Sequence, residues 1–305
     1  MKVVIDTDTA SDDAVALIMA LRSPEVDVVG ITTVSGNVDI EQATRNARYT
    51  LELCDVDVPL SRGADRPLLR EPRYAHAFHG HDGLGDRGFV PRDPDACDVH
   101  AVDSLIDHLR EGETTLVTLG PLTNVALAFR RAPELASVVP RCVVMGGAAC
   151  TVGNVTPAAE FNIWVDPDAA KIVFSSGVPI EMVGWELSRG KAALDEAGLD
   201  EIRAVDTPYA RFALDCNATA IDGSRRLGET GLGLPDPVAM AVALDPTVAT
   251  RTSRHHVDVE TTGRLTRGMT VVDQLGVTGR KPNATVVWEI DVPRWKAMLL
   301  DALRA

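Results

Sequence analysis

Four aspartates lie within eight residues, directly after the apolar run Val-Val-Ile: Asp6, Asp8, Asp12 and Asp13. Four carboxylates at the end of one strand repel one another strongly unless a positive charge lies among them. They offer only oxygen ligands, without His or Cys, which favours a hard cation such as Ca²⁺ or Mg²⁺ over zinc. The alternatives are helix capping by Ser11 and Asp12, which accounts for one or two of the acids, or a single protonated acid. The pattern therefore predicts a metal site.

The same stretch, VVIDTDT, also fits the aspartate-nucleophile phosphatases. There one Asp attacks phosphorus and a second, two residues on, protonates the leaving group. That chemistry needs a downstream lysine to neutralise the phosphate and a further acidic pair for Mg²⁺. The chain has only five lysines, and neither candidate, Lys171 or Lys191, lies in a convincing loop. The phosphatase hypothesis is weakened but stays open.

Two further polar clusters bear on the choice between these chemistries. Residues 146–162 read GGAACTVGNVTPAAEFN and carry Asn154, Glu160 and Asn162. Two amides and a carboxylate without a basic residue suit a neutral polyhydroxylated ligand better than a phosphate. At residues 235–237, Pro-Asp-Pro opens the apolar stretch 238–244, so Asp236 is either an N-cap or a ligand brought back to the first cluster.

The elements that must position these residues alternate along the chain. Continuous apolar, β-branched runs predict buried strands at residues 3–5, 26–34, 114–119, 142–145 and 180–183. Helical patterns lie at residues 12–21, 41–53, 99–110, 122–130 and 167–174. Further strands are expected at residues 257–260, 269–272 and 286–290, followed by a C-terminal helix from about residue 292.

Alternating strands and helices predict an α/β fold with one open, mostly parallel, doubly wound (Rossmann-like) sheet flanked by helices. The last strands form an added C-terminal edge. No linker rich in Pro, Ser or charge interrupts the pattern, so residues 1–305 are expected to form a single domain. Ligands of such sheets bind beyond the carboxyl ends of the strands, which is where the polar clusters lie.

Composition excludes several classes of protein. The chain has 305 residues, 45% of them hydrophobic, and a net charge of −14. It can bury a sizeable core, and its charge repels nucleic acid. It has no run of 18 apolar residues and no signal-peptide pattern, so we expect a cytoplasmic protein without a membrane partner. Five scattered cysteines without CxxC spacing argue against disulfides and zinc: Cys54, Cys97, Cys142, Cys150 and Cys216.

Eight sequence blocks, in order along residues 4–273, resemble the nucleoside hydrolases of the inosine–uridine type. They are DTDTASDDAVAL (6–17), VSGNV (34–38), HGHDGLG (79–85), LGPLTNVALA (119–128), MGGA (145–148), GNVTPAAEFNIWVDPDAA (153–170), LPDPVA (234–239) and LTRGMTVVD (265–273). The acidic block alone is moderately specific, whereas all eight in this order make a strong match. The resemblance implies hydrolysis of the N-glycosidic bond of ribonucleosides to free base and ribose.

The resemblance also implies a calcium site. Asp8, Asp13 and Asp236 would be carboxylate ligands of Ca²⁺, and the backbone carbonyl of Leu119 a fourth ligand. Asp8 would be the general base for a Ca²⁺-bound water that attacks the anomeric carbon. A homodimer or homotetramer is implied as well, with a small-molecule nucleoside as the substrate.

The remaining site residues implied by the resemblance would bind the ribose. Asp12, Asn162 and Asp236 would contact the 2′ and 3′ hydroxyls. Asn154 and Glu160 would hold the 5′ hydroxyl. Met145 would pack on the sugar, and Asn37 would lie near the attacking water.

The chain departs from the family pattern in two places. Thr9-Ala10 stands where the family usually has Pro-Gly, so the turn geometry is expected to differ slightly. Pro235 stands where members commonly place a leaving-group His, and proline donates no proton. His79, in the Gly-rich block and titrating near neutrality, is the best remaining catalytic donor. Trp185 and Tyr209 are weaker candidates for contact with the base.

Three hypotheses therefore remain. The favoured one is a Ca²⁺-dependent ribonucleoside N-ribohydrolase. The alternatives are an Mg²⁺-dependent phosphatase with an aspartate nucleophile and a non-catalytic protein that binds a nucleoside or ribose. Release of reducing sugar from nucleosides distinguishes the three.

Overall fold

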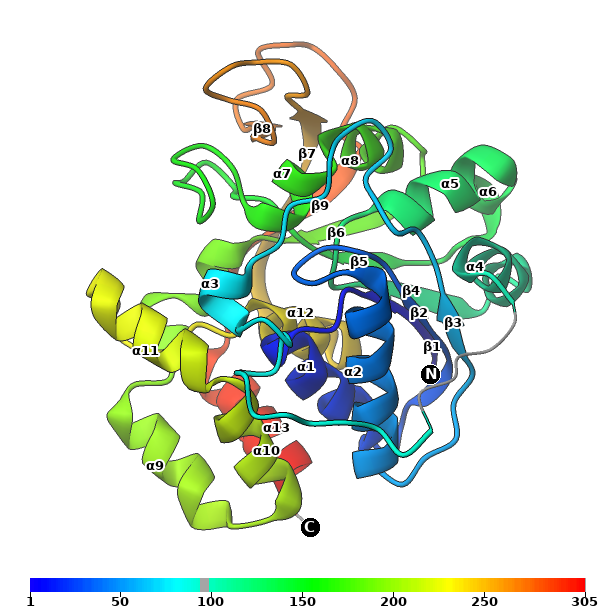
Figure 1. The fold of residues 1–305 in the computed structure, drawn as a ribbon. Helices are drawn as coiled ribbons and strands as arrows, with labels where there is room; N and C mark the ends of the chain where they lie inside the picture. The colour runs from blue at the N-terminus through cyan, green and yellow to red at the C-terminus, as the bar shows by residue number, and fades with distance from the viewer. Residues whose placement is uncertain (94–98, 305) are drawn as a thin grey trace.

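The computed structural model describes residues 1–93 and 99–304, so Cys97 lies outside the described residues. Nine strands form a sheet in the order β3-β2-β1-β4-β5-β6-β9-β7-β8 (Figure 1). Their bounds are β1 (Lys2–Thr7), β2 (Asp27–Thr33), β3 (Leu60–Arg62), β4 (Thr114–Thr118), β5 (Cys142–Met145), β6 (Ile180–Val183), β7 (Ala249–Val259), β8 (Thr270–Asp273) and β9 (Ala284–Ile290).

The helices lie mostly between consecutive strands, as the alternating sequence pattern predicts. They are α1 (Ser11–Leu21), α2 (Ile40–Leu53), α3 (His76–His79), α4 (Ala101–Arg110), α5 (Thr123–Arg131), α6 (Leu135–Val138), α7 (Phe161–Val165), α8 (Pro167–Phe174), α9 (Glu196–Val205), α10 (Pro208–Cys216), α11 (Ala218–Leu227), α12 (Pro235–Leu244) and α13 (Val292–Leu303). Three 3₁₀ turns complete the elements: η1 (Trp185–Ser188), η2 (Gly190–Ala192) and η3 (Pro246–Val248).

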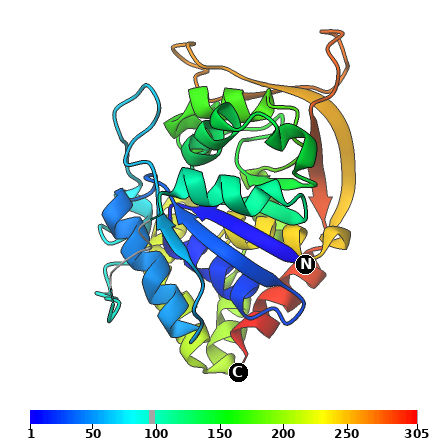
Figure 2. The ribbon, with the colours of Figure 1, turned by 90° about the vertical axis from the view of Figure 1, so that its right-hand side faces the viewer.

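The sheet separates two hydrophobic cores because successive side chains of a strand point to opposite faces. In β1, Val3 and Ile5 join the core formed with α1, α2, α12 and α13. Val4, between them, joins the core formed with α4, α5 and α8. The two helical layers lie on opposite sides of the sheet (Figure 2). Both faces are covered, which explains why the strands are apolar throughout rather than alternating.

The predicted fold class is confirmed. Strands β1 to β6 pair in parallel, β9 adds in parallel to β6, and β7 and β8 extend the sheet antiparallel. The predicted bounds of β5, β6 and α8 match the structure. None of the helices among residues 1–93 and 99–304 has both the length and the apolar character that crossing a membrane requires.

Several boundaries differ from the prediction. Strand β7 begins at Ala249 rather than at 257, because its first half is polar and exposed and is held by pairing with β9. Tyr209 lies in α10, which is followed by α11 with Asn217 between the two helices.

The order of the first strands determines where a ligand can bind. In the sheet, β2 and β3 lie on one side of β1, and β4, β5 and β6 lie on the other side. Neighbouring connections therefore diverge between β1 and β4, which is the usual binding crevice of a doubly wound sheet. Asp8 follows β1 and Leu119 follows β4, so both lie at this switch point.

Candidate active site

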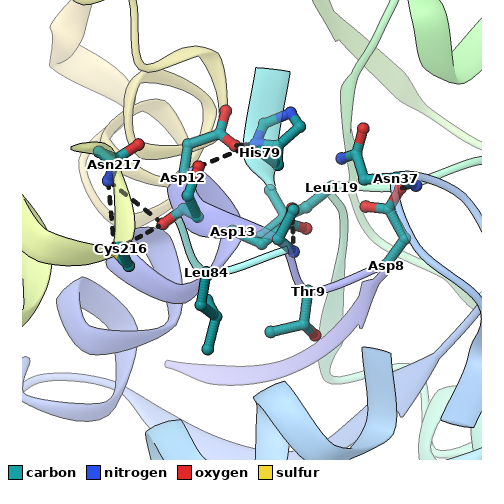
Figure 3. A network of polar contacts seen from close by, with 12 residues as sticks. Asp8, Thr9, Asp12, Asp13, Asn37, His79, Leu84, Leu119, Cys216 and Asn217 are labelled. Atoms are coloured by element: carbon teal, nitrogen blue, oxygen red, sulfur yellow. Dashed lines mark hydrogen bonds and ion pairs between the residues drawn. The ribbon is translucent and has the colours of Figure 1, made fainter. Parts of the chain in front are cut away.

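Asp8 follows the end of β1, and Asn37 lies beside it (Figure 3). Its Oδ2 accepts a hydrogen bond from the backbone N–H of Asn37 at 2.6 Å. A Cβ at Gly36 would lie 2.0 Å from Asp8 Oδ2, and one at Gly120 would lie 2.9 Å from the Asp8 nitrogen. The two glycines therefore let the loops after β2 and β4 close on Asp8, while its Oδ1 stays buried without a hydrogen-bond partner.

The turn between β1 and α1 carries backbone strain at Thr9. Its φ is +23°, a region that β-branched residues rarely adopt. The Thr9 N–H donates to Thr7 Oγ1 at 3.0 Å. Asp13 closes the turn: its Oδ2 accepts from the Ala10 N–H at 2.9 Å, and its Oδ1 accepts from Thr7 Oγ1 at 2.6 Å. Asp13, rather than Ser11 or Asp12, therefore stabilises the start of the helix.

Three carboxylates converge at the starts of α1 and α12. One oxygen each of Asp12, Asp13 and Asp236 lies within 4.8 Å of the others. Helix α1 packs against α12. Asp236 lies in the first turn of α12, where Leu234 is the N-cap, so Asp236 is not the cap. The structure thus brings together Asp13 and Asp236, two predicted metal ligands, and adds Asp12, which was expected to contact sugar hydroxyls, whereas Asp8, the third predicted carboxylate ligand, is not part of this group.

The acids of this cluster are hard to ionise together. Burial raises the pKa of Asp12 and of Asp13 to about 6. Burial also raises the pKa of Asp8, helped by the charge of Asp13. The pKa of Asp236 rises for the same reason, with the charges of Asp12, Asp13 and Asp8 adding to burial. A cation among these groups would offset both causes.

The donor set fits such a cation. Asp8, Asp12 and Asp236 each keep one buried oxygen, Oδ1, without a hydrogen-bond partner. Unsatisfied buried carboxylate oxygens are costly, and a cation held by Asp8 and Asp236 would satisfy two of them. Every donor is an oxygen, as hard divalent cations prefer.

The loop of residues 146–162, here called the sugar loop, folds around Glu160. Glu160 is buried and caps α7, with Oε1 accepting from the Asn162 N–H at 2.7 Å. Its Oε2 accepts from the Gly147 N–H at 2.8 Å and the Ile163 N–H at 3.2 Å. Burial raises the pKa of Glu160 to about 7. The charge of Asp12 adds to this rise, and the charge of Glu160 in turn raises the pKa of Asp236, so the sugar loop lies near the acidic cluster.

Asn162 connects the sugar loop to two strand ends. Its Nδ2 donates to the Leu119 carbonyl at 2.7 Å and lies 3.3 Å from Met145 Sδ. Asn162, Leu119 and Met145 are all buried. Asn154 differs from the other predicted sugar contacts, because it is exposed and its Oδ1 accepts from the Phe161 N–H at 3.0 Å.

His79 is the last residue of α3 and the first residue of the Gly-rich block 79–85. Its Nδ1 lies 2.8 Å from Ser11 Oγ and 3.7 Å from Asp12 Oδ1. Burial lowers the pKa of His79 to about 4, opposed by the charge of Asp13. The expectation that His79 titrates near neutrality is therefore wrong for this environment: the imidazole is neutral at pH 7.

Glu186 is a residue of this region that sequence analysis missed. It lies in η1 after β6, and its Oε1 accepts from the Ala149 N–H of the sugar loop at 3.2 Å. Its Oε2 is buried without a partner, and burial raises its pKa to about 7, with the charge of Glu160 adding to the rise. The sequence signal that could have found Glu186 is its position just after the carboxyl end of β6, where ligands of such sheets bind.

Trp185 and Tyr209, the two candidate aromatic contacts of the base, lie in different parts of the molecule. Trp185 Nε1 donates to the Val152 carbonyl at 2.8 Å, so Trp185 supports the sugar loop. Tyr209 packs under Arg22, whose guanidinium lies 3.9 Å from the ring centroid. Because Arg22 follows the C-terminal end of α1, Tyr209 lies roughly 15 Å from the acidic end of that helix.

The lysine needed by a phosphatase is also placed elsewhere. Lys171 pairs with Asp258 of β7 at 3.2 Å. Lys191 lies in η2, beyond η1. Neither observation supports phosphate neutralisation beside Asp8.

Comparisons with known proteins agree on one family. The model of the family described as inosine-uridine preferring nucleoside hydrolase matches residues 3–297. The pyrimidine-specific ribonucleoside hydrolase RihA of Salmonella typhimurium is 39% identical, covering 100% of this chain and 98% of that protein. The fold is similar to the solved plant nucleoside hydrolase PpNRh1, with a TM-score of 0.92, 34% identity and coverage of 100% and 99%. It is also similar to the purine-preferring ribonucleoside hydrolase from Gardnerella vaginalis, with a TM-score of 0.91, 33% identity and coverage of 99% and 98%.

Proposed function

The chain belongs to the inosine–uridine preferring nucleoside hydrolase family, and from this premise we propose how its residues perform the reaction. It is a ribonucleoside hydrolase, which breaks the N-glycosidic bond of a nucleoside. The phosphatase and the non-catalytic binding protein are not favoured by this membership.

The proposed metal is Ca²⁺, with Asp8, Asp13, Asp236 and the Leu119 carbonyl as its protein ligands. Two observations support this proposal: the buried Oδ1 atoms of Asp8 and Asp236 have no hydrogen-bond partner, and oxygens of Asp13 and Asp236 lie within 4.8 Å of each other. Asp13 accepts two hydrogen bonds, but a carboxylate has about four lone-pair sites and can still serve as a ligand. Calcium tolerates the irregular shell that such a set offers. When bound, a divalent cation supplies Lewis-acid chemistry: it lowers the pKa of a water molecule and orients the two neighbouring hydroxyls of the sugar.

Asp8 is the proposed general base. The Asn37 N–H holds Oδ2, so Asp8 is oriented while its Oδ1 is free of protein hydrogen bonds.

The remaining acids and amides would stabilise the sugar. Breaking the N-glycosidic bond builds positive charge on the ribose ring, and preorganised carboxylates stabilise that charge. Asp12, Asn162 and Asp236 are the proposed contacts of the 2′ and 3′ hydroxyls. Asn154 and Glu160 are the proposed contacts of the 5′ hydroxyl, with Met145 against the ring and Asn37 near the water.

His79 is the proposed donor to the departing base, acting as a neutral imidazole. If Ser11 Oγ donates its proton to Nδ1, the ring hydrogen lies on Nε2 and is available for donation. Neutral histidines act as electrophiles in other enzymes when their surroundings lower the pKa. Pro235, in the usual His position, cannot fill this role.

Three properties of the whole chain complete the proposal. Residues 1–305 form one domain, the enzyme is cytoplasmic, and it assembles as a homodimer or homotetramer. Light scattering coupled to gel filtration measures the assembly, and a monomer would contradict it.

A nucleoside panel with a reducing-sugar readout tests the activity. The panel contains uridine and inosine, because similar proteins are named as pyrimidine-specific and as purine-preferring. We expect free base and ribose in equal amounts with added Ca²⁺. Tight nucleoside retention without ribose release, or hydrolysis of p-nitrophenyl phosphate instead, would overturn the proposal.

A further inference from the structure

Three arginines gather at a cavity outside the acidic site. The cavity has a volume of about 590 Å³ and is lined by Leu69, Arg70, Glu71, Arg73, Trp164, Val165 and Arg267. The lining comes from the segment before α3, from α7 and from the turn between β7 and β8, which lie near the top of Figure 1. In a chain with a net charge of −14, three guanidinium groups at one cavity are unexpected.

Arg267 is the most constrained of the three. Its guanidinium lies 4.3 Å from the centroid of the Trp164 ring, which fixes the group by a cation–π contact. Burial lowers the pKa of Arg267, and the charges of Arg70 and Arg73 lower it further, opposed by the charge of Asp168. The lining holds three arginines and one acid, so positive charge predominates and an anion would relieve the repulsion.

Arg70 is tied on one side and open on the other. It pairs with Asp168 at 3.2 Å, and its Nη2 donates to the Thr261 carbonyl at 2.6 Å. Its Nε, by contrast, is a buried donor without a hydrogen-bond partner. Glu71 is exposed and is the one acid among the lining residues, so it does not neutralise both Arg73 and Arg267.

These features select a class of ligand. Guanidinium groups match phosphate oxygens in paired hydrogen bonds, and a dianion suits several arginines better than a monoanion. The cavity volume is within the range of small-molecule sites and exceeds the space that a lone phosphate ion fills. We propose that Arg70, Arg73 and Arg267 bind the phosphate group of an organic phosphate monoester, whose organic part occupies the cavity beside Trp164.

Calorimetric titration with ribose 5-phosphate, inorganic phosphate and ribose tests this site. We expect ribose 5-phosphate to bind more tightly than either fragment, with an affinity that falls as salt rises. Arg267→Gln should weaken binding by roughly tenfold or more, the usual effect of losing a charged hydrogen bond. Arg73→Gln, at an exposed position, should weaken it as well. Arg264→Gln, on the same turn but outside the lining, is the matched control and should bind like the unmodified protein.

Asp8→Asn separates this cavity from the active site and should leave the affinity for ribose 5-phosphate unchanged. Equal losses in Arg264→Gln and Arg267→Gln would overturn the site in favour of general surface charge. Loss of binding in Asp8→Asn would assign the ligand to the active site instead. Equal affinity for inorganic phosphate would overturn the role of the organic part.

Discussion

Asp8 combines two properties that a reacting carboxylate needs, namely a fixed orientation and an oxygen without a protein partner. The Asn37 N–H supplies the first, and the close approach of Gly36 excludes other groups from Oδ2. The side chain is completely buried, so its surroundings rather than bulk water set its basicity.

Asp8→Asn tests this role at the residue scale. Asparagine keeps an oxygen for the Asn37 N–H but cannot take a proton, so we expect kcat on uridine or inosine to fall by roughly 10²–10⁴-fold. The assay is run with saturating Ca²⁺ so that weaker metal binding does not limit the rate. The exposed Asp57→Asn serves as the control and should retain activity. Substantial turnover by folded Asp8→Asn would rule out a general base at this position.

His79→Ala tests the proposed donor. Because protonation helps a nucleobase to leave, kcat on nucleosides should fall by roughly 10²–10⁴-fold. p-Nitrophenyl riboside should be affected far less, because its leaving group needs no proton. His76→Ala, in the same short helix, is the control. If both substrates lose activity equally, His79 instead positions Ser11 and Asp12, which are its neighbours.

At the scale of elements, η1 and the sugar loop support each other. The Trp185 N–H donates to the Gly147 carbonyl at 3.1 Å, and Glu186 accepts from Ala149. Glu160 then holds the Gly147 N–H from the other side. The conformation of the sugar loop therefore depends on a segment that follows a different strand.

The variant Glu186→Gln tests how the protonation of Glu186 makes the stability of the fold depend on pH. The folded-state pKa of Glu186 is raised from 4.5 to about 7, so the folded state keeps a proton that the unfolded state loses. Glu186 therefore lowers the unfolding free energy progressively as the pH rises from about 4.5 to about 7. Glutamine keeps the acceptor for Ala149 but does not titrate. We expect the melting temperature of Glu186→Gln, relative to the unmodified protein, to rise between pH 5 and pH 8.

The exposed Glu201→Gln is the control for this series and should show no such trend. A constant difference between Glu186→Gln and the unmodified protein across this pH range would mean that Glu186 is ionised throughout. The measurement is thermal unfolding followed by circular dichroism at fixed ionic strength.

At the scale of the whole molecule, the acidic cluster couples metal binding to folding. The cluster of Asp12, Asp13 and Asp236 lies where α1 meets α12. Both helices pack in the core on one face of the sheet. Chelation should lower activity and melting temperature together, because a ligand present at 100 times its dissociation constant stabilises the fold by about 2.7 kcal/mol. Ca²⁺ should restore both better than Mg²⁺, whose octahedral shell is less adaptable.

Asp236→Asn is the sharpest control for the chelation experiment. In chelator it should melt at a higher temperature than the unmodified protein, since it removes one of the repelling charges. With Ca²⁺ present, Asp236→Asn should melt at a lower temperature than the unmodified protein, because the variant has lost one carboxylate ligand of the ion. An unchanged melting temperature after demonstrated removal of the ion would contradict a shared metal site.

The amino-acid sequence by itself determined the alternation of strands and helices in the central α/β unit and the chemistry of its acidic end. Buried parallel strands are apolar on both faces, so β1, β5 and β6 are recognisable as continuous runs. The loops that follow such strands form the ligand-binding edge of a doubly wound sheet, which singled out the polar residues Asp8, Glu160 and Asn162. The exposed first half of β7 carried no such pattern, because its partner β9 rather than a core holds it.

Only the tertiary structure decided how these residues meet and what their surroundings do to them. Asp236 joins Asp12 and Asp13 because α12 packs on α1, a contact between distant segments that no local pattern encodes. Burial made His79 neutral, and the same cause raised the pKa of Glu186, which sequence analysis did not single out although it follows a predicted strand. Asn154, by contrast, stays at the surface. Residue type determines which chemistry is available, whereas desolvation and charge proximity depend on the folded packing of the whole chain.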